Sequence, residues 1–319
     1  MRLVFAGTPE PAVVALQKLI DSDHEVLAVL TQPDARRGRG RTLHPSAVAE
    51  LAESHGIEVI KPTSLKADTE DGQLVRERLA ELQPDCLPVV AFGQLITKDL
   101  LDVAPHGWVN LHFSLLPAWR GAAPVQASIR EGDQVTGATC FRIDEGLDTG
   151  LILSTLEDEI QATDTADDLL TRLACSGADL LVQTMTDLEQ GNITPREQTG
   201  EATYASKITT EDARIDWSEP AEVIDRHIRA HTPGPGAWTM LDDTRVKVGP
   251  VTLVAEGQER NEEVPTLAPG AISAGKNTVY VGTGTHMITL GQLQPPGKKM
   301  MNSSDWARGV HIDQEANFI

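Results

Sequence analysis

The chain has 319 residues, of which 40% are apolar and 23% charged, the composition of a folded globular protein rather than a disordered one. Domains usually run to about 100–200 residues, so this length favours two domains. The 47 acidic side chains outnumber the 27 basic ones and give a formal net charge of −20, which excludes a protein that binds nucleic acid nonspecifically over its whole surface.

The apolar stretch in the N-terminal segment MRLVFAGTPE is too short for the hydrophobic region of a secretory signal peptide. No window of the sequence approaches the run of about 18 uninterrupted apolar residues that a membrane-spanning helix needs. We therefore expect a cytoplasmic protein without membrane attachment. Cys86, Cys140 and Cys175 are widely spaced, and each lies in an apolar or small-residue stretch. Buried free thiols are expected, because cytosolic cysteines stay reduced and no CxxC pair is present.

The first half of the chain alternates β-branched runs with amphipathic helical patterns, an order typical of βαβ units around a parallel sheet. Strands are expected at 3–6, 26–31, 58–60, 87–91 and 108–111, and the runs 136–143 and 151–160 read as a hairpin-like extension of the sheet. Helices are expected at 11–22, 45–55, 72–82, 98–103 and 165–190. The last of these ends before Gly191 and Asn192, a helix stop signal.

The pattern changes after residue 191. Residues 192–206 lack periodicity, and a helix at 220–229 is followed by short strand-like runs at 237–241, 245–254, 270–274, 278–282 and 286–292. Short strands with Gly and Pro between them indicate a small OB-like β-barrel. The expected fold is therefore an α/β, Rossmann-like parallel-sheet catalytic domain at 1–191, a linker at 192–206 and a smaller OB-like β-barrel domain at 207–319.

Polar side chains gather where the strand beginning at residue 108 ends. Asn110 and His112 are two residues apart, so in a strand both project to the same side of the sheet. Ligands of open parallel sheets bind beyond the carboxyl ends of the strands, which is where this strand delivers an amide and an imidazole. A single histidine at the end of a strand more often has only a structural hydrogen bond. A functional site is therefore indicated by the polar groups expected near His112 and not by the histidine alone.

Asp148 lies in the sequence GLDTG after a later strand, where Gly146 and Gly150 permit tight backbone geometry. A carboxylate on such a loop can orient a neighbouring imidazole and raise its proton affinity, although it can also simply cap a turn. An amide, an imidazole and a carboxylate suit the transfer of an acyl carbon between two nitrogens. The segment GTPEPA lacks the GxGxxG spacing of a dinucleotide site, and the sequence contains no CxxC pair, so no metal is expected.

Several segments together resemble the 10-formyltetrahydrofolate-dependent formyltransferases, and within them the members that act on methionyl-tRNA. The segments are NLHFSLLPAWRGAAP, TGATCFRIDEGLDTG, VFAGTPEPAVVAL, TQPDARRGRGRTLHPSAV, KITTEDARIDWS and LQPPGKK. The resemblance covers essentially the whole chain. It implies formyl transfer from 10-formyltetrahydrofolate, as co-substrate, to the free amine of initiator methionyl-tRNA for translation initiation.

The resemblance also implies roles for individual residues. Asn110, His112 and Asp148 are the expected catalytic set. The expected folate-site residues are Ser114, Leu115, Leu116 and Pro117. The chain pattern adds an apolar wall from Val89, Val90, Phe92 and Leu95, of which the two valines equally suit ordinary core packing. A monomer is expected, because a protein that embraces tRNA can work without a second copy.

Basic residues that could hold tRNA occur in two places. Arg36, Arg37, Arg39 and Arg41 lie in one Gly-containing loop, which can settle on phosphates or base edges, and Arg39 is the foremost candidate by the resemblance. The alternatives are a solvated loop or an anion-binding loop for folate glutamates. Lys298 and Lys299 in PPGKK form the second candidate, with a solvated turn as its alternative, and Arg120 and Arg214 carry less weight.

Three other functions stay open from the residues alone. A formyltransferase acting on a small amine, such as glycinamide ribonucleotide or an amino sugar nucleotide, would share the same catalytic groups. A hydrolase that releases formate from the same carrier would replace the amine by water. A catalytically silent RNA-binding protein is disfavoured by the aromatic content of only 4%, which leaves few platforms for stacking bases.

Overall fold

The computed structural model describes residues 1–37, 42–254, 267–310, 312 and 316–319, and the chain divides into two compact units. The first unit comprises Met1–Pro124, Val135–Glu159 and Leu170–Ala205, and the second comprises Val125–Gln134, Ile160–Leu169 and Ser206–Ile319. Two short segments that precede residue 170 thus belong with the C-terminal unit. The domain boundaries at residues 191 and 207 stay a prediction.

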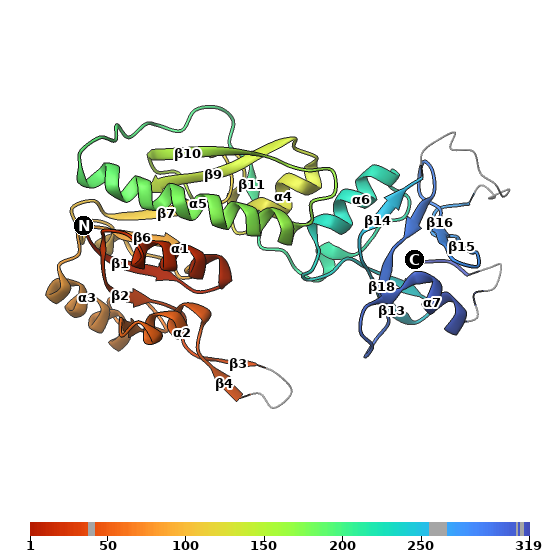
Figure 1. The fold of residues 1–319 in the computed structure, drawn as a ribbon, viewed down its shortest axis with the longest axis horizontal. Coiled ribbons are helices and arrows are strands. Elements are labelled where there is room, and N and C mark those ends of the chain that lie inside the picture. Colours follow the sequence, from red (N-terminus) through yellow and green to blue (C-terminus); the bar gives the residue numbers. More distant parts are fainter. Residues whose placement is uncertain (38–41, 255–266, 311, 313–315) are drawn as a thin grey trace. The chain divides into compact units, whose positions relative to one another are not determined.

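A seven-stranded sheet, with strand order β10-β9-β7-β6-β1-β2-β5, forms the centre of the first unit (Figure 1). Its strands are β1 (Arg2–Gly7), β2 (Glu25–Leu30), β5 (Glu58–Ile60), β6 (Leu87–Val90), β7 (Trp108–His112), β9 (Val135–Arg142) and β10 (Ile152–Glu159). The five strands from β7 to β5 are parallel, whereas β9 pairs antiparallel with β7, and β10 pairs antiparallel with β9. Parallel strands are covered on both faces, which explains their continuous apolar sequences.

Helices connect the parallel strands, as the sequence pattern predicted. They are α1 (Glu10–Ile20), α2 (Ala47–Ser54) and α3 (Glu70–Leu82), with the long α5 (Ala166–Glu189) after β10. The side chains of Ser46 and Thr69 cap α2 and α3 by accepting hydrogen bonds from backbone N–H groups. The predicted helix at 98–103 was wrong in type: only a 3₁₀ turn forms, η1 (Lys98–Leu100), because Pro105 and Gly107 leave too few residues for a stable α-helix. The helix α4 (Pro124–Glu131) was not predicted.

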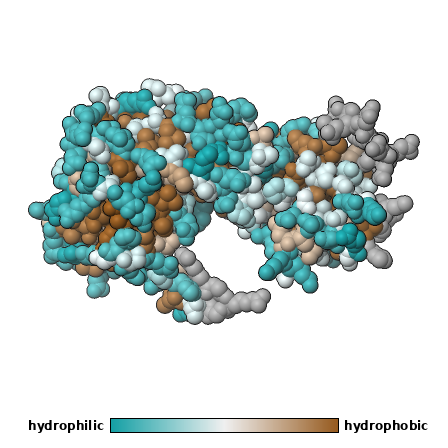
Figure 2. Space-filling view, in the orientation of Figure 1, coloured by the Kyte–Doolittle hydropathy of each residue, from teal (hydrophilic) through white to brown (hydrophobic). Residues whose placement is uncertain are grey.

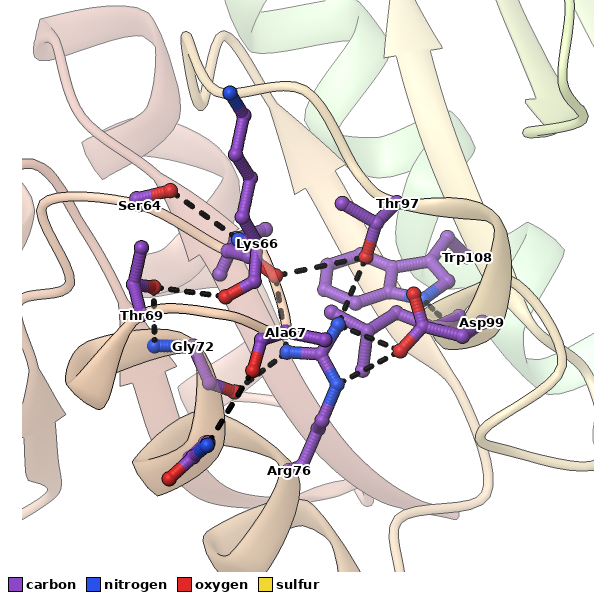
Figure 3. Close-up of polar contacts among 12 residues, drawn as sticks. Ser64, Lys66, Ala67, Thr69, Gly72, Arg76, Thr97, Asp99 and Trp108 are labelled. Carbon is purple, nitrogen blue, oxygen red and sulfur yellow. Dashed lines mark hydrogen bonds and ion pairs between the residues drawn. The ribbon is translucent and has the colours of Figure 1, made fainter.

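A hydrogen-bond network around Arg76 of α3 holds η1 beside the start of β7 (Figure 3). The Arg76 guanidinium donates to Asp99 at 2.7 Å, to Thr97 at 3.0 Å and to the Leu65 carbonyl at 2.9 Å. The Leu100 carbonyl of η1 then accepts a 2.7 Å hydrogen bond from the indole of buried Trp108. The network therefore anchors the strand on which Asn110 and His112 lie.

Among its described residues, the second unit contains two four-stranded antiparallel sheets, two α-helices after residue 206 and most of α4. One sheet has the order β12-β13-β18-β19 and the other β14-β17-β16-β15. The bounds are β12 (Trp238–Leu241), β13 (Thr244–Val248), β14 (Val251–Leu253), β15 (Ile272–Ala274), β16 (Val279–Val281), β17 (Ile288–Leu290), β18 (Gln292–Gln294), β19 (Met301–Asn302), η2 (Glu211–Ala213), α6 (Ala221–Ala230) and α7 (Ser303–Gly309). The predicted fold class is confirmed: a Rossmann-like α/β unit is followed by a smaller unit of antiparallel strands.

Two predicted strands of the second unit are each broken in two by glycine. The run 245–254 is interrupted at Gly249 and Pro250, between β13 and β14, and the run 286–292 is interrupted at Gly291, between β17 and β18. Both breaks let the chain pass from one sheet to the other, which a strand of alternating side chains cannot do without a turn. A single apolar core, including Trp217, Trp306 and Phe318, contains residues of both sheets.

Figure 2 shows hydrophilic residues spread over the visible face of each unit, with apolar residues interspersed between them. Among the described helices, none has both the length and the apolar sequence required to cross a membrane. Cys86 and Cys140 are buried free thiols, as predicted, but Cys175 is exposed, so that prediction was wrong: it lies on the solvent side of α5, where small-residue neighbours do not imply burial.

Candidate active site

The strand β7 places Asn110 and His112 on the same face of the sheet, as alternation predicted. In the register, Asn110 lies opposite Val89 of β6 and Phe141 of β9. Leu111 points to the other face, where a Cβ added to Gly177 of α5 would be 3.2 Å from its side chain. Asn110 and His112 therefore project away from α5.

His112 is held in one orientation by two contacts. Its Nε2 atom lies 2.9 Å from the carbonyl oxygen of Trp119, and its ring meets Phe141 edge-on, with 6.3 Å between the ring centroids. A carbonyl oxygen can only accept, so Nε2 must carry the proton. In the neutral ring the lone pair is therefore on Nδ1, the atom that faces Asp148.

Asp148 meets His112 through one carboxylate oxygen. Its Oδ2 atom lies 3.8 Å from His112 Nδ1 and accepts a 2.7 Å hydrogen bond from the Gly121 backbone N–H. Asp148 itself has a left-handed backbone with φ of 51°, a conformation that Asp tolerates better than most residues. Gly121 has a φ of 118°, and a Cβ there would lie 2.6 Å from the Ala205 carbonyl oxygen, so glycine is required where the backbone approaches the carboxylate.

Gln198 supports the Asp148 loop, a role that the sequence did not reveal. Its Nε2 atom donates to the carbonyl oxygens of Asp148 and Gly150 at 2.8 and 2.9 Å, and its Oε1 accepts from Arg120 at 2.6 Å. The segment 192–206, predicted as a linker, thus runs along the site, and its strand β11 (Tyr204–Ala205) pairs with β8 (Arg120–Gly121). No local pattern signals such a residue, because its partners are about 50 and 80 positions away.

Burial and charge act in opposite directions on the pKa of His112. Burial lowers the pKa, since a charged ring is poorly solvated there, and the Asp148 carboxylate raises it by a smaller amount. The net pKa lies below the usual value of 6.5. The sequence predicted the raising effect of Asp148 but not the larger effect of burial. His112 is consequently a neutral base at neutral pH rather than a resting cation.

The Asn110 amide is half-buried, and no hydrogen bond to its side chain forms within the described residues. Buried amides in proteins are normally paired, so an unpaired amide at a strand end is available to a ligand. Its two N–H donors lie on the same face as the His112 ring. This places a donor pair and a proton acceptor on one side of the sheet.

The residues predicted to line a folate site follow the ends of two neighbouring strands. Val90 ends β6, and the buried Phe92 follows it, with its carbonyl accepting from Thr8 at 3.0 Å and Gln32 at 3.2 Å. The loop after β7 contains Ser114, Leu115, Leu116 and Pro117, with a cis bond before the proline. Ser114 is buried and donates to the Ala118 carbonyl, so its hydroxyl shapes the loop. Leu95 is 83% exposed, which does not fit a packed apolar wall.

The basic residues lie in both units. Arg36 and Arg37 belong to β3 (Ala35–Arg37), which pairs with β4 (Thr42–His44), whereas Arg39 and Arg41 lie outside the described residues. Lys298 and Lys299 are exposed in the turn after β18. Of the two lesser candidates, Arg120 is bound to Gln198, and Arg214 lies 5.6 Å from the Trp238 ring. The described residues include no group of three or more potential metal ligands.

Comparison with known proteins gives the same family for both parts of the chain. Residues 1–185 match the model of the formyl transferase family, and residues 207–311 match the model of the formyl transferase C-terminal domain. The methionyl-tRNA formyltransferase of Corynebacterium efficiens is 82% identical over 318 residues, which is 100% of both chains. That of Rhodococcus erythropolis is 53% identical over 99% of both chains.

Solved structures share the fold at much lower sequence identity. The N-formyltransferase from Helicobacter canadensis, solved with folinic acid and dTDP-3-aminofucose, has a TM-score of 0.67 at 20% identity, over 92% of this chain and 98% of that one. The methionyl-tRNA formyltransferase from Clostridium thermocellum has a TM-score of 0.55 at 18% identity, over 80% and 94%. These likenesses support the fold.

Proposed function

The chain belongs to the formyl transferase family, and on that premise we propose that it transfers the formyl group of 10-formyltetrahydrofolate to the α-amino group of methionyl initiator tRNA. The product is N-formylmethionyl-tRNA, which serves translation initiation. Relatives that match this chain over 99–100% of their length are named methionyl-tRNA formyltransferase, which supports methionyl-tRNA as the substrate. The observation that carries the chemistry is the approach of His112 Nδ1 to Asp148 Oδ2, at 3.8 Å, beside the Asn110 amide, which has no hydrogen-bond partner among the described residues.

His112 is the proposed general base. The amine nitrogen attacks the formyl carbon and a new C–N bond forms, while the Nδ1 lone pair of His112 takes a proton from that nitrogen. The bond between the formyl carbon and N10 of the folate then breaks, and His112 returns the proton to N10. The proton balance is closed within the site, and Nδ1 is the only ring nitrogen free for this task, because Nε2 donates to the Trp119 carbonyl.

Asn110 and Asp148 act on the charges that this reaction creates. Negative charge develops on the formyl oxygen, where the N–H groups of the Asn110 amide can donate. Positive charge develops on the His112 ring, and the Asp148 carboxylate stabilises it. Because Gly121 fixes the same Asp148 oxygen, the carboxylate is already in place before the ring is charged.

The two substrates have separate proposed binding residues. We assign the folate to the surroundings of Ser114, Leu115, Leu116, Pro117, Val90 and Phe92, at the strand ends next to Asn110. We assign tRNA to Arg36, Arg37, Arg39, Arg41, Lys298 and Lys299, since arginine and lysine neutralise phosphates. In this proposal residues 1–191 form the catalytic domain and 207–319 contribute to tRNA binding, and the protein works as a monomer.

The test compares amine acceptors in one assay. The purified chain is incubated with 10-formyltetrahydrofolate and, separately, with initiator methionyl-tRNA, elongator methionyl-tRNA, glycinamide ribonucleotide or an amino sugar nucleotide. We expect the initiator methionyl-tRNA alone to gain the mass of a formyl group. Formylation of a small amine instead would overturn the proposed substrate, and release of formate without any acceptor would indicate a hydrolase.

A further inference from the structure

The second unit contains a groove of about 410 Å³ whose lining carries positive charge and no carboxylate. The lining residues are Thr210, Pro235, Arg245, Lys247, Gln294, Pro295, Pro296 and Gly297. Two other hollows of this unit contain acidic side chains: one is lined by Asp216, and the other by Asp133, Glu222 and Asp225. The chain as a whole has 47 acidic and 27 basic side chains, so a groove lining with basic but no acidic side chains differs from the charge balance of the protein. This lining indicates a binding site for an anionic ligand.

Arg245 is held flat on an aromatic ring. Its guanidinium carbon lies 3.9 Å from the centroid of the Trp238 ring, a cation–π arrangement. Trp238 is itself fixed, because it is only 7% exposed and its indole N–H donates to the Thr210 carbonyl at 2.7 Å. The guanidinium therefore rests on a rigid platform, which lowers the entropy cost of binding a partner.

The N–H donors of Arg245 have no acceptor in the part of the chain that the structure describes. Within the described residues Arg245 has no hydrogen bond and no ion pair, although it is exposed at the edge of the groove. Lys247, two positions along β13, lies on the same side of the strand and donates to the Pro235 carbonyl at 2.7 Å. Arg245 thus offers an unoccupied planar donor set, and Lys247 adds a second positive charge beside it.

The turn after β18, which includes the groove residue Gly297, contains further positively charged residues. Gly297 lines the groove, and Lys298 and Lys299 follow it directly. Gln294 holds this turn by donating to the Lys298 carbonyl at 2.8 Å. The groove residues Pro295, Pro296 and Gly297 are therefore followed along the chain by two exposed cations.

We propose that Arg245, stacked on Trp238 and assisted by Lys247, binds a backbone phosphate of the RNA substrate in this groove. The proposal rests on the proposed function, because it takes the RNA from the transfer reaction. The guanidinium matches the two free oxygens of a phosphodiester with two parallel N–H donors, and a site held by a fixed ring positions the RNA without reading its bases. The groove is a binding site and takes no part in the chemical step.

The test is the variant Arg245→Ala in the full chain, compared with Lys276→Ala. Lys276 is an exposed cation of the same unit, in the turn between β15 and β16 and outside the groove, so both variants remove one positive charge. For Arg245→Ala we expect the KM for methionyl-tRNA and the Kd for uncharged initiator tRNA to rise roughly three- to tenfold. The slope of log K against log salt concentration should fall by about one. The kcat and the KM for the folate should not change, and Lys276→Ala should resemble the wild type.

Each outcome decides one question. If the wild type formylates methionyl-tRNA and Arg245→Ala keeps the wild-type Kd and salt slope, the groove proposal is overturned while the proposed function stands. Equal effects of Arg245→Ala and Lys276→Ala would also overturn it, because general charge would then suffice. If the wild type formylates no tRNA, it is the proposed function that fails. Should Arg245→Ala unfold, Arg245→Gln is the replacement, since it keeps a planar group for Trp238.

Discussion

His112 Nδ1 and Asp148 Oδ2 lie 3.8 Å apart, a separation beyond hydrogen-bond length. The gap follows from the proton on Nε2: the neutral ring presents a lone pair to a carboxylate that also only accepts. Once Nδ1 takes up a proton, the same pair attracts. The arrangement therefore favours the charged ring at the moment when the proposed reaction creates it, and leaves the resting ring free to act as a base.

Asp148→Asn removes the charge but keeps an oxygen for the Gly121 N–H. We expect kcat to fall about 10²–10⁴-fold, because the ring cation is no longer stabilised. The acid limb of kcat/KM should move to lower pH, since Asp148 raises the pKa of His112 and its loss leaves the lowering effect of burial opposed only by the smaller effect of the Trp119 hydrogen bond. A pH–rate profile measures both effects. Glu145→Gln, on the same loop and exposed, is the matched control. An unchanged limb would show that Asp148 does not act on His112.

Asn110→Ala removes the proposed donor to the formyl oxygen. The expected result is a fall in kcat of about 10²–10³-fold with little change in the KM for either substrate, since the charge on that oxygen develops only in the transition state. Steady-state kinetics with both substrates varied measure this split. Asn192→Ala changes a surface asparagine and should have no effect. A rise in KM alone would mean that Asn110 binds substrate without acting in the chemical step.

Gln198→Ala should lower kcat roughly tenfold by loosening the Asp148 loop, because the hydrogen bonds to the Asp148 and Gly150 carbonyls are lost. The distinguishing measurement is a double-mutant cycle with Asp148→Asn. If Gln198 acts by positioning Asp148, the second substitution should cost much less in the Gln198→Ala background than in the wild type. Fully additive losses would contradict this role.

The half-buried His227 and the buried His231 should make the second unit less stable in acid. Burial lowers the pKa of His227 to about 4 and also lowers that of His231, with Arg130 acting in the same direction and Asp212 raising the pKa of His231. Both folded-state values lie below the unfolded value of about 6.5, so the unfolded chain binds more protons between those values. Stability is thus complete above about pH 6.5 and is lost as the pH falls towards 4. Calorimetry across this range measures the loss.

His231→Phe tests the same pair. The Nε2 atoms of both histidines are buried without a hydrogen-bond partner in the described part of the chain, so an apolar ring at 231 removes an unpaired polar atom. We expect a Tm at neutral pH that is equal to or above that of the wild type, and a weaker fall in acid. A steeper fall than in the wild type would contradict the assignment.

Replacing Arg36, Arg37, Arg39 and Arg41 by Ala together should weaken tRNA use more than folate use. Arginines in a loop contact phosphates, and the contribution of each such contact weakens as salt rises. The measurement is the KM for each substrate at two salt concentrations. Equal increases in both would assign the loop to the folate glutamates instead.

Local patterns in the sequence were enough to predict most strands and the first-unit helices. Continuous apolar runs, such as LVFA in β1, and helical spacing, as in α5, are properties of the local sequence and do not depend on the tertiary structure. The secondary-structure predictions failed where tertiary packing determines whether a segment forms a helix. The segment 98–103 is only a 3₁₀ turn, and α4 was missed, because short segments have little helical stability of their own and depend on tertiary packing.

The sequence by itself determined the residues of the candidate site: the two-residue spacing of Asn110 and His112 fixes their common face on any strand, and the GLDTG loop offers Asp148 a tight turn. Only the tertiary structure decided which nitrogen of His112 is free, that burial outweighs Asp148 in its pKa, and that Gln198 braces the loop. Spacing along a strand is a local property of the backbone. Proton position and pKa depend on groups that folding brings together from distant parts of the chain.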